Sequence, residues 1–204
     1  MRDHALVKRI LRGDRAAGEQ FVAENYPRIF RLLRYLTGER DTAEDLTQQT
    51  FTRAWQALPG FKGESSAGTW LHRIAYHEYT HWLRAQRPHV GLEAAAEIAD
   101  PRTPQSLETI LLPAALAQLP LEQREAFLLY YVQELSIVEV AEVLEIPAGT
   151  VKSRLFAARQ RLRVLLQDSV EAGPSGSYSS SLDRLIQEAV PDGLSTSPSQ
   201  HRAD

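Results

Sequence analysis

The 204-residue sequence contains no cysteine. This absence excludes disulfide bonds, thiolate metal sites and cysteine nucleophiles. The sequence also lacks any hydrophobic run that approaches the roughly 20 residues needed to span a bilayer. Its N-terminal segment is charged and amphipathic, whereas a signal peptide has an apolar core. These absences predict a cytoplasmic protein with no membrane insertion.

Charge is distributed unevenly along the chain, although the net charge is only -3. Residues 1–88 carry 14 Lys and Arg against 10 Asp and Glu, and residues 121–167 carry 6 of each kind. Residues 89–120 carry 1 basic residue against 4 acidic ones, and residues 168–204 carry 2 against 6. Local fields of this kind, more than net charge, decide where a polyanion docks. The sequence is therefore compatible with nucleic-acid binding by the two neutral-to-basic segments.

Helical periodicity dominates, and no segment alternates apolar and polar residues in the manner of a strand. Three prolines and few large apolar side chains mark residues 87–104 as a linker. The glycine- and serine-rich composition from Gly173 onward is typical of a flexible segment. The pattern predicts helices at about 3–12, 15–36, 41–57, 67–85, 105–118, 121–133, 136–144 and 148–167.

These elements predict an all-α fold with two helical domains joined by a flexible acidic linker. The expected parts are an N-terminal helical bundle (1–88), the linker (89–107), a C-terminal four-helix helix-turn-helix domain (108–170) and a flexible C-terminal extension (171–204). Within the extension, one side of a short amphipathic piece carries Leu182, Leu185, Ile186 and Val190. Two interpretations of the extension stay open: a segment that modulates activity, or a disordered end.

Residues 139–162 are the most informative stretch of the C-terminal domain. An apolar-periodic helix ends near Leu144, a turn follows, and the next helix carries five basic and no acidic residues. Ser136 and Glu139 form an S-x-x-E capping box at the start of the first of these helices. A helix-turn-helix with a basic second helix is the arrangement that places a helix in the DNA major groove.

Side chains of the basic helix divide into two predicted groups. An outward stripe suited to base edges consists of Lys152, Ser153, Phe156 and Arg159. Flanking side chains that could reach phosphates are Arg154, Arg161 and Arg163. Taken alone, this charge also fits an ordinary solvated helix face.

Two segments of the N-terminal domain are harder to explain as core. Residues 41–55 predict a helix with an acidic start, and one face of it carries Asp41, Glu44, Asp45 and Gln48. Residues 61–75 form a glycine- and serine-containing loop that leads into a helix with aromatic and basic residues. Aromatic side chains interleaved with arginines suit unstacked single-stranded bases. An ordinary solvated face is again the plainer alternative for the acidic helix.

The chain resembles the extracytoplasmic-function sigma factors of bacterial RNA polymerase across roughly residues 5–167. DTAEDLTQQTFTRAW looks like the core-polymerase-binding helix, and FKGESSAGTWLHRIAYHEYTHWLRAQR looks like the region that melts and reads the minus-ten element. The stretch from Leu119 to Leu162 looks like the domain that reads the minus-thirty-five element. The resemblance implies core RNA polymerase and promoter DNA as partners, together with an anti-sigma factor, and it implies no catalytic residue, metal site or cofactor.

The resemblance also implies roles for individual residues. Docking on the polymerase is implied for Asp41, Glu44, Asp45, Leu46, Gln48, Gln49 and Phe51. Contact with the minus-ten element is implied for Phe61, Lys62, Ser65, Ser66, Trp70, Arg73, His77 and Arg84. The family's common aromatic after the serines is replaced by Ala67 and Gly68, and its frequent Asn and Asp appear as His77 and His81. Base choice at the minus-ten element therefore stays open.

Two other functions compete with this interpretation. His77, Glu78 and His81 satisfy H-E-x-x-H, the pattern of zinc hydrolases, in which the glutamate activates a zinc-bound water. Such a site needs a third protein ligand, and the metzincin continuation fails at Arg84. A transcriptional regulator that acts without polymerase would use the helix-turn-helix but would leave the acidic helix and the aromatic loop without a role.

Overall fold

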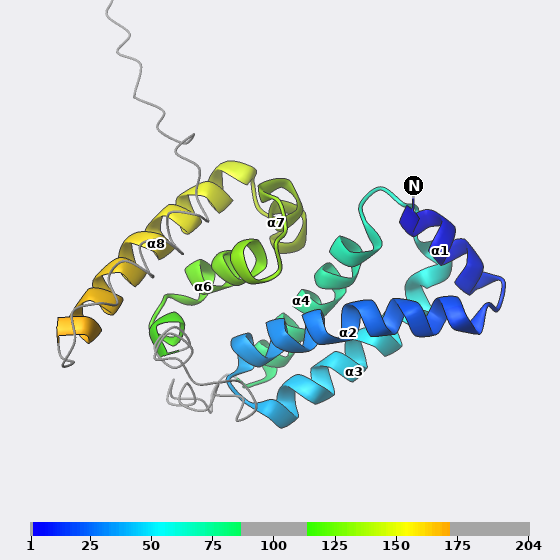
Figure 1. The fold of residues 1–204 in the computed structure, drawn as a ribbon, viewed down its shortest axis with the longest axis horizontal. Helices are drawn as coiled ribbons and strands as arrows, with labels where there is room; N and C mark the ends of the chain where they lie inside the picture. Colours follow the sequence, from blue (N-terminus) through cyan, green and yellow to red (C-terminus); the bar gives the residue numbers. More distant parts are fainter. Residues whose placement is uncertain (1, 87–113, 172–204) are drawn as a thin grey trace, which may run out of the picture.

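The computed structural model describes residues 2–86 and 114–171 of the chain (Figure 1). Within these two ranges the structure is helical and contains no strand, so the predicted all-α class is confirmed. The predicted linker, most of the predicted helix at 105–118 and nearly all of the C-terminal extension lie outside the described residues.

The N-terminal domain is a bundle of four α-helices with a short 3₁₀ turn before the last of them. Its elements are α1 (Arg2–Leu11), α2 (Arg15–Thr37), α3 (Arg40–Ala57), η1 (Leu58–Gly60) and α4 (Ala67–Gln86). Asp14 caps α2 by accepting the Ala17 N–H at 3.0 Å. Gly38, with a φ of 75°, ends α2 in the left-handed conformation that glycine adopts at little cost. The predicted helix boundaries agree with these to within about two residues.

The C-terminal domain contains the predicted helix-turn-helix. Its elements are a helical turn at 114–117, α6 (Leu121–Phe127), the π-helical turn η2 (Leu128–Val132), α7 (Ile137–Leu144) and α8 (Ala148–Glu171). The capping box is confirmed, since the Glu139 N–H donates to the Ser136 hydroxyl at 3.3 Å and the Ser136 N–H donates to the Glu139 carboxylate at 2.9 Å.

Two local features of this domain differ from a regular helix-turn-helix pattern. The single helix predicted at 121–133 winds into a π-helical turn, in which the Gln133 N–H donates to the Leu128 carbonyl at 3.0 Å. The turn after α7 passes through Glu145, whose φ of 55° and ψ of 42° lie in the left-handed region that is unusual for a glutamate. Both features face the N-terminal domain in the arrangement described next.

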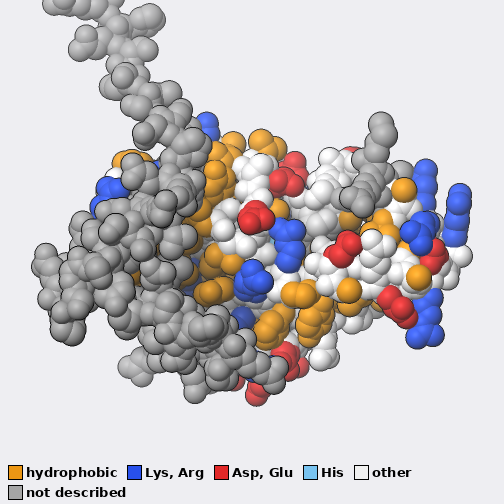
Figure 2. Space-filling view, viewed as in Figure 1, with side chains coloured by type: hydrophobic (Ala, Val, Ile, Leu, Met, Phe, Trp, Pro, Cys, Tyr) orange, Lys and Arg blue, Asp and Glu red, His pale blue; other side chains and the backbone are white. Residues whose placement is uncertain are grey.

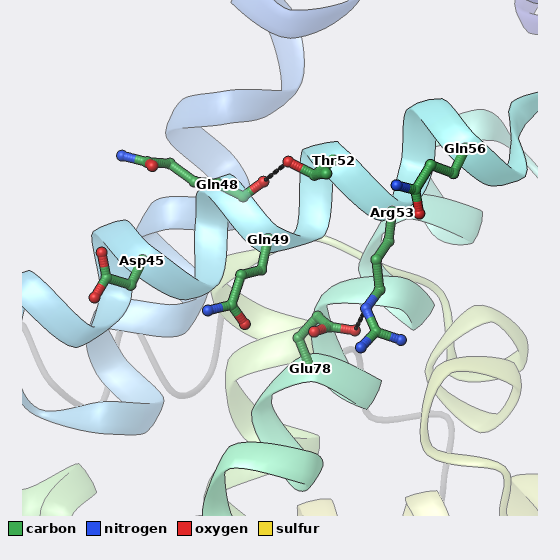
Figure 3. Close-up of a pocket in the computed structure, with 7 residues that line it drawn as sticks. All are labelled: Asp45, Gln48, Gln49, Thr52, Arg53, Gln56 and Glu78. Atoms are coloured by element: carbon green, nitrogen blue, oxygen red, sulfur yellow. Dashed lines mark hydrogen bonds and ion pairs between the residues drawn. The ribbon is translucent and has the colours of Figure 1, made fainter.

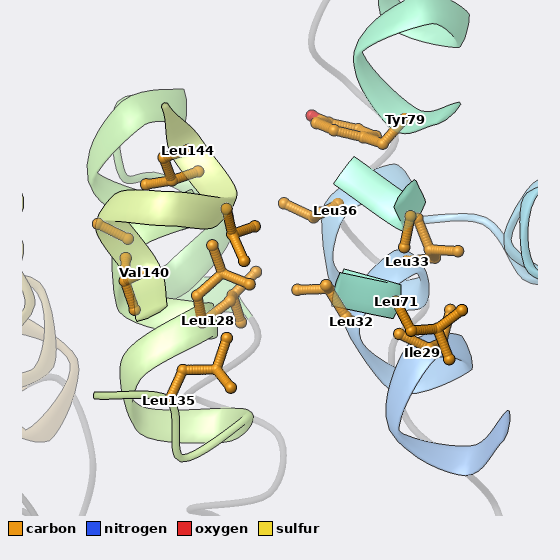
Figure 4. Close-up of a cluster of buried hydrophobic side chains, with 14 of the residues drawn as sticks. Ile29, Leu32, Leu33, Leu36, Leu71, Tyr79, Leu128, Leu135, Val140 and Leu144 are labelled. Atoms are coloured by element: carbon orange, nitrogen blue, oxygen red, sulfur yellow. The ribbon is translucent and has the colours of Figure 1, made fainter. Parts of the chain in front are cut away.

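The two domains pack against each other, with α4 against α7 and α2 against η2. One cluster of buried apolar side chains runs through both domains. In Figure 4, Leu32 and Leu36 of α2 point toward Leu128 of η2 across the junction. The chain is therefore organised as two helical domains that share a continuous interface.

Candidate functional site

The acidic helix α3 presents a polar outer face and an apolar inner face. Asp41, Asp45, Gln48 and Gln49 are exposed, while Glu44 is half-buried and accepts a bond from Arg40 at 2.9 Å. Leu46 is 3% exposed and Phe51 is 9% exposed, so both belong to the core. The docking role that the resemblance implies for these two residues stays a prediction, and their burial shows that they support α3 from inside.

A shallow polar hollow of about 500 Å³ lies where α3 meets α4 (Figure 3). The residues that line it are Asp45, Gln48, Gln49, Thr52, Arg53, Gln56 and Glu78. Arg53 Nε lies 2.7 Å from Glu78 Oε1, and the Glu78 side chain is only 5% exposed. This ion pair links the outer face of α3 to α4 and neutralises a buried carboxylate.

Glu78 of the H-E-x-x-H pattern is therefore paired with Arg53, a partner that the zinc-hydrolase pattern did not suggest. His77, the first histidine of that pattern, lies beside Glu145 in the turn after α7, with its Nε2 3.3 Å from the carboxylate. In the described ranges no three His, Asp or Glu side chains are grouped as metal ligands would be. The sequence pattern drew attention to Glu78, but the structural reason for this glutamate is its pair with Arg53.

The loop before α4 is held by a cap and by an aromatic pair. The Thr69 N–H donates to the Ser66 hydroxyl at 2.9 Å, so Ser66 begins α4 as a capping residue. Phe61 and Trp70 meet edge to face, with ring centroids 5.3 Å apart. Both rings are half-buried, and Lys62 beside them is exposed. The loop is thus a folded rim with accessible aromatic and basic groups.

The other predicted minus-ten residues are spread along α4. Arg73 and His77 are exposed one and two turns beyond Trp70, and Ser65 is half-buried in the loop. Arg84 is exposed but lies about 21 Å from Trp70 along the helix axis, at 1.5 Å per residue. The structure therefore brings Phe61, Trp70 and the loop together and leaves Arg84 at the far end.

Acidic side chains of the C-terminal domain meet this same helix. The Arg73 guanidinium donates to Glu145 Oε1 at 2.8 Å, and the Thr69 hydroxyl donates to Glu139 Oε1 at 2.6 Å. The hydrogen bond from Arg73 lowers the pKa of Glu145. Burial would raise the pKa of Glu139, but hydrogen bonds from Thr69 and Ser136 outweigh burial and lower it. Sequence analysis missed these contacts, because nothing in a single sequence pairs residues about 70 positions apart.

Deeper in the junction, His72 and Gln133 form a buried polar contact. His72 Nδ1 lies 2.7 Å from the Gly68 carbonyl, and its Nε2 lies 3.2 Å from Gln133 Oε1. Burial lowers the pKa of His72, which keeps the ring neutral with its proton on Nδ1. Nε2 is then an acceptor, so turning the Gln133 amide over, which puts its NH₂ in place of Oε1 beside His72, satisfies both groups. Arg28 donates to the Gln133 carbonyl and holds the same turn.

The basic helix α8 exposes most, but not all, of the predicted DNA-contacting side chains. Lys152, Ser153, Arg161 and Arg163 are exposed, and Phe156 is 61% exposed. Arg159 is half-exposed and its Nε atom is buried, so it is less accessible than the other members of the stripe, and its contact with DNA stays a prediction.

Arg154 also departs from the predicted pattern. It donates to Glu122 of α6 at 2.9 Å, with its side chain 20% exposed. A partner of the opposite charge thus occupies an arginine that was expected to reach phosphate.

A further basic group lies outside the predicted surfaces. Figure 2 shows Lys and Arg side chains gathered at the end of the molecule that α1 and the start of α2 form, where Lys8, Arg9, Arg12 and Arg15 are exposed. Arg9 pairs with Asp14, and Arg15 pairs with Glu19. Such surface pairs contribute little to stability. In the described ranges, no helix is long and apolar enough to cross a membrane.

Comparison with known proteins decides the family. Residues 21–89 match Sigma-70 region 2, and residues 109–162 match Sigma-70, region 4. The ECF RNA polymerase sigma factor SigW of Bacillus subtilis is 30% identical over 178 residues, which cover 79% of this chain and 95% of that protein. The chain belongs to the extracytoplasmic-function sigma factors. As a sigma factor, it binds core RNA polymerase and directs promoter-specific transcription initiation.

Other similar proteins agree with this membership. The ECF RNA polymerase sigma factor SigM of Mycobacterium tuberculosis is 34% identical over 166 residues, covering 80% of this chain and 84% of that protein. The sigma factor RpoE from Bartonella quintana, solved in complex with the anti-sigma factor NepR, has a TM-score of 0.65 at 28% identity and covers 73% of this chain and 96% of its own. CnrH, solved in complex with the cytosolic domain of CnrY, has a TM-score of 0.64 at 25% identity and covers 81% of this chain and 97% of its own. Membership of this family decides against a regulator that acts without polymerase.

Proposed function

We propose that three surfaces divide the work of this sigma factor. The outer face of α3 docks on core RNA polymerase, the start of α4 with its preceding loop binds the melted minus-ten element, and α8 contacts the minus-thirty-five element. The observation that carries the proposal is the sidedness of α3, which buries Leu46 and Phe51 while it exposes Asp41, Asp45, Gln48 and Gln49. A helix anchored in this way offers a rigid polar surface to a partner.

A charge-insertion experiment tests the α3 surface. Gln48→Arg combined with Gln49→Arg adds bulk and positive charge at the exposed face without touching the core. We expect at least a tenfold loss of affinity for core RNA polymerase. The matched control is Gln20→Arg, at an exposed position of α2, which should bind as the unmodified chain does. Equal binding by the double variant and the control would refute docking through α3.

The loop and the start of α4 are proposed to bind melted DNA through Phe61, Trp70 and Arg73. Base stacking on an aromatic ring contributes about 1–3 kcal/mol per base. Trp70 is half-buried against Phe61, so one ring supports the other while both remain partly accessible. We expect Arg73→Ala to reduce run-off transcription by the reconstituted holoenzyme while polymerase affinity stays within twofold. Unchanged transcription would remove Arg73 from the proposed site.

For α8, we propose that Phe156 and Ser153 lie against base edges and that Lys152, Arg161 and Arg163 lie near phosphates. Removing one phosphate contact, as in Lys152→Ala, lowers the salt dependence of binding by about one unit of slope. Phe156→Ala is expected to weaken binding to the preferred promoter without that change in slope, since an apolar contact releases no counterions. Titrating binding against salt separates the two roles.

The cellular setting follows from the same proposal. Two similar sigma factors were solved with partners, RpoE with the anti-sigma factor NepR and CnrH with the cytosolic domain of CnrY. We infer that an anti-sigma factor likewise binds this chain. We also infer that the sigma factor acts in the cytoplasm, where the polymerase is, and that the sigma factor catalyses no reaction itself. Co-purification of the tagged chain from its host, with and without added core polymerase, identifies such a partner.

A further inference from the structure

A mostly apolar hollow of about 540 Å³ lies between α1, the start of α2 and the end of α3. Its apolar wall consists of Ile10, Val22, Ala23 and Trp55. The Trp55 ring packs on the core residue Phe21, with ring centroids 6.0 Å apart, yet Trp55 is 41% exposed. The hollow shares no residue with the polar one at α3 and α4. The three surfaces proposed above therefore do not account for it.

Basic side chains border this hollow on α1 and the first turn of α2. The exposed members of this basic rim are Lys8, Arg9, Arg12 and Arg15. Figure 2 shows Lys and Arg side chains gathered at the same end of the molecule. Two of the four are paired with carboxylates at 2.8 Å, whereas Lys8 and Arg12 form no ion pair with a side chain that the structure describes. An apolar wall with a basic rim suits an amphipathic helix that has acidic flanks.

The sequence supplies such a segment after α8. Residues 182–190 lie outside the described residues, and helical spacing places four of their apolar side chains on one side: Leu182, Leu185, Ile186 and Val190. Asp183 and Glu188 fall on the two borders of that side at 100° per residue. Residues 168–204 carry 6 acidic residues against 2 basic ones. The tail thus complements the hollow in both hydropathy and charge.

The tail of the same molecule is too short to reach this hollow. Ten residues separate Glu171, where α8 ends, from Leu182, and they span at most about 38 Å when extended. In Figure 1, α8 ends at one end of the molecule and the turn between α1 and α2 lies at the other, with α8 and α2 following one another between them. These two helices are about 36 and about 35 Å long at 1.5 Å per residue. A second copy of the chain is therefore the source of a tail that can reach the hollow.

We propose that residues 182–190 of one molecule dock as an amphipathic helix in the hollow between α1 and α2 of a second copy. The apolar side of the helix lies against Trp55 and Val22, and its acidic flanks lie beside the basic rim. Two molecules that exchange tails form a closed dimer. The contact is small, so the chain associates weakly and reversibly. This inference goes beyond the proposed function and does not depend on it.

A peptide-binding experiment tests the hollow. The probe is a fluorescein-labelled peptide of residues 178–194, and the receptor is the full chain with Leu185→Asp and Ile186→Asp, whose own tail no longer competes. We expect saturable binding that Ala23→Asp weakens at least tenfold, because Ala23 is exposed and lines the hollow. The charge-matched control is Gln20→Asp, at an exposed position of α2 outside the hollow, which should weaken binding less than threefold. Equal affinities for the two variants, or no binding at all, would overturn the inference.

Sedimentation of the full chain tests the second copy as the source of the tail. Between about 1 and about 200 µM, the range in which small interfaces associate, we expect the mass of the unmodified chain to rise toward that of a dimer. The chain with Leu185→Asp and Ile186→Asp should stay monomeric throughout. Association that persists in this variant would show another interface and refute the inference. Peptide binding by an unmodified chain that stays monomeric would mean that each tail folds back on its own molecule, which also refutes the exchange.

Discussion

Glu125 is a buried carboxyl group at the junction of the two domains. It accepts the Tyr76 hydroxyl at 3.0 Å and is 5% exposed. Burial raises its pKa to about 7, although the hydrogen bond from Tyr76 and the charges of Arg154 and Arg124 oppose the rise. The folded protein therefore holds this proton at a pH where an unfolded chain, with a glutamate pKa near 4.5, has lost it.

Stability should consequently fall as pH rises from about 4.5 to about 7 because of Glu125. In that window the folded state binds more protons than the unfolded state, so the free energy of unfolding decreases with pH. Above pH 7 the loss is complete, and it is on the order of 3 kcal/mol from a shift of this size. We expect Glu125→Gln, which cannot ionise, to stabilise the protein more at pH 8 than at pH 5.5, measured by urea unfolding.

The pH dependence of stability must be compared between the variant and the unmodified chain, because His72 changes stability with pH in the opposite direction to Glu125. Its pKa is lowered by burial, so its protonation destabilises the fold as pH falls below 6.5. Subtracting the free energy of unfolding of the unmodified chain from that of Glu125→Gln at each pH removes the contribution of His72. Glu142→Gln, which removes an exposed carboxylate, serves as the control. A difference for Glu125→Gln that is flat between pH 5.5 and 8 would contradict the assignment.

At the level of single residues, periodicity predicted exposure better than it predicted partners. The outward positions of Asp41, Asp45 and Gln48 follow from helical spacing and agree with the structure. The environments of Arg154 and Arg159 do not follow from it, since Arg154 is engaged by Glu122, 32 residues earlier in the chain. Contacts of this kind depend on how helices pack, which the spacing within one helix does not specify.

Among the helices, α7 depends most clearly on a local signal. Its capping box satisfies backbone N–H groups at both Ser136 and Glu139, and α7 has only 8 residues. Loss of a serine N-cap costs about 1 kcal/mol. We expect Ser136→Ala to lower the free energy of unfolding by about that amount, measured by urea unfolding followed by circular dichroism.

The control for the capping prediction is Ser153→Ala. The Ser153 hydroxyl donates back to the Thr150 carbonyl within α8 and caps no N–H group. Its removal should change stability by less than about 0.5 kcal/mol, as is usual for surface substitutions. If the two variants lose equal stability, the cap does not hold α7.

Helix positions and ends were largely predictable, whereas the form of η2 was not. Caps and breaks at Asp14, Gly38 and Ser136 are local signals that a single sequence carries. The π-helical turn at 128–132 has no such signal, because its apolar residues continue the helical periodicity of α6. The turn nevertheless has a consequence for the whole molecule, since it is followed by Gln133, which bonds His72.

At the scale of the whole molecule, the two-domain plan was predictable and the packing of one domain on the other was not. In an isolated helix-turn-helix, Glu145 would be an ordinary solvated carboxylate, and Glu139 would only complete its capping box with Ser136. Their partners Thr69, Arg73 and His77 lie in the other domain, beyond a linker whose sequence does not specify a docking geometry. The packing of the two domains thus depends on the α4 surface and on the helix-turn-helix surface together.

The packed junction predicts that the two domains unfold as one cooperative unit. All three tryptophans, Trp55, Trp70 and Trp82, lie in the N-terminal domain, so their fluorescence reports on that domain alone. Gln133→Ala alters only the C-terminal domain but leaves the buried Nε2 of His72 without a partner, at a cost of about 1–3 kcal/mol.

We therefore expect Gln133→Ala to lower the urea midpoint of the tryptophan transition together with that of the helical signal. Gln160→Ala, on the exposed face of α8, should move neither transition. If the tryptophan transition stays in place while the helical signal divides into two steps, the domains unfold independently. That result would limit the packing between the two domains to a weak contact.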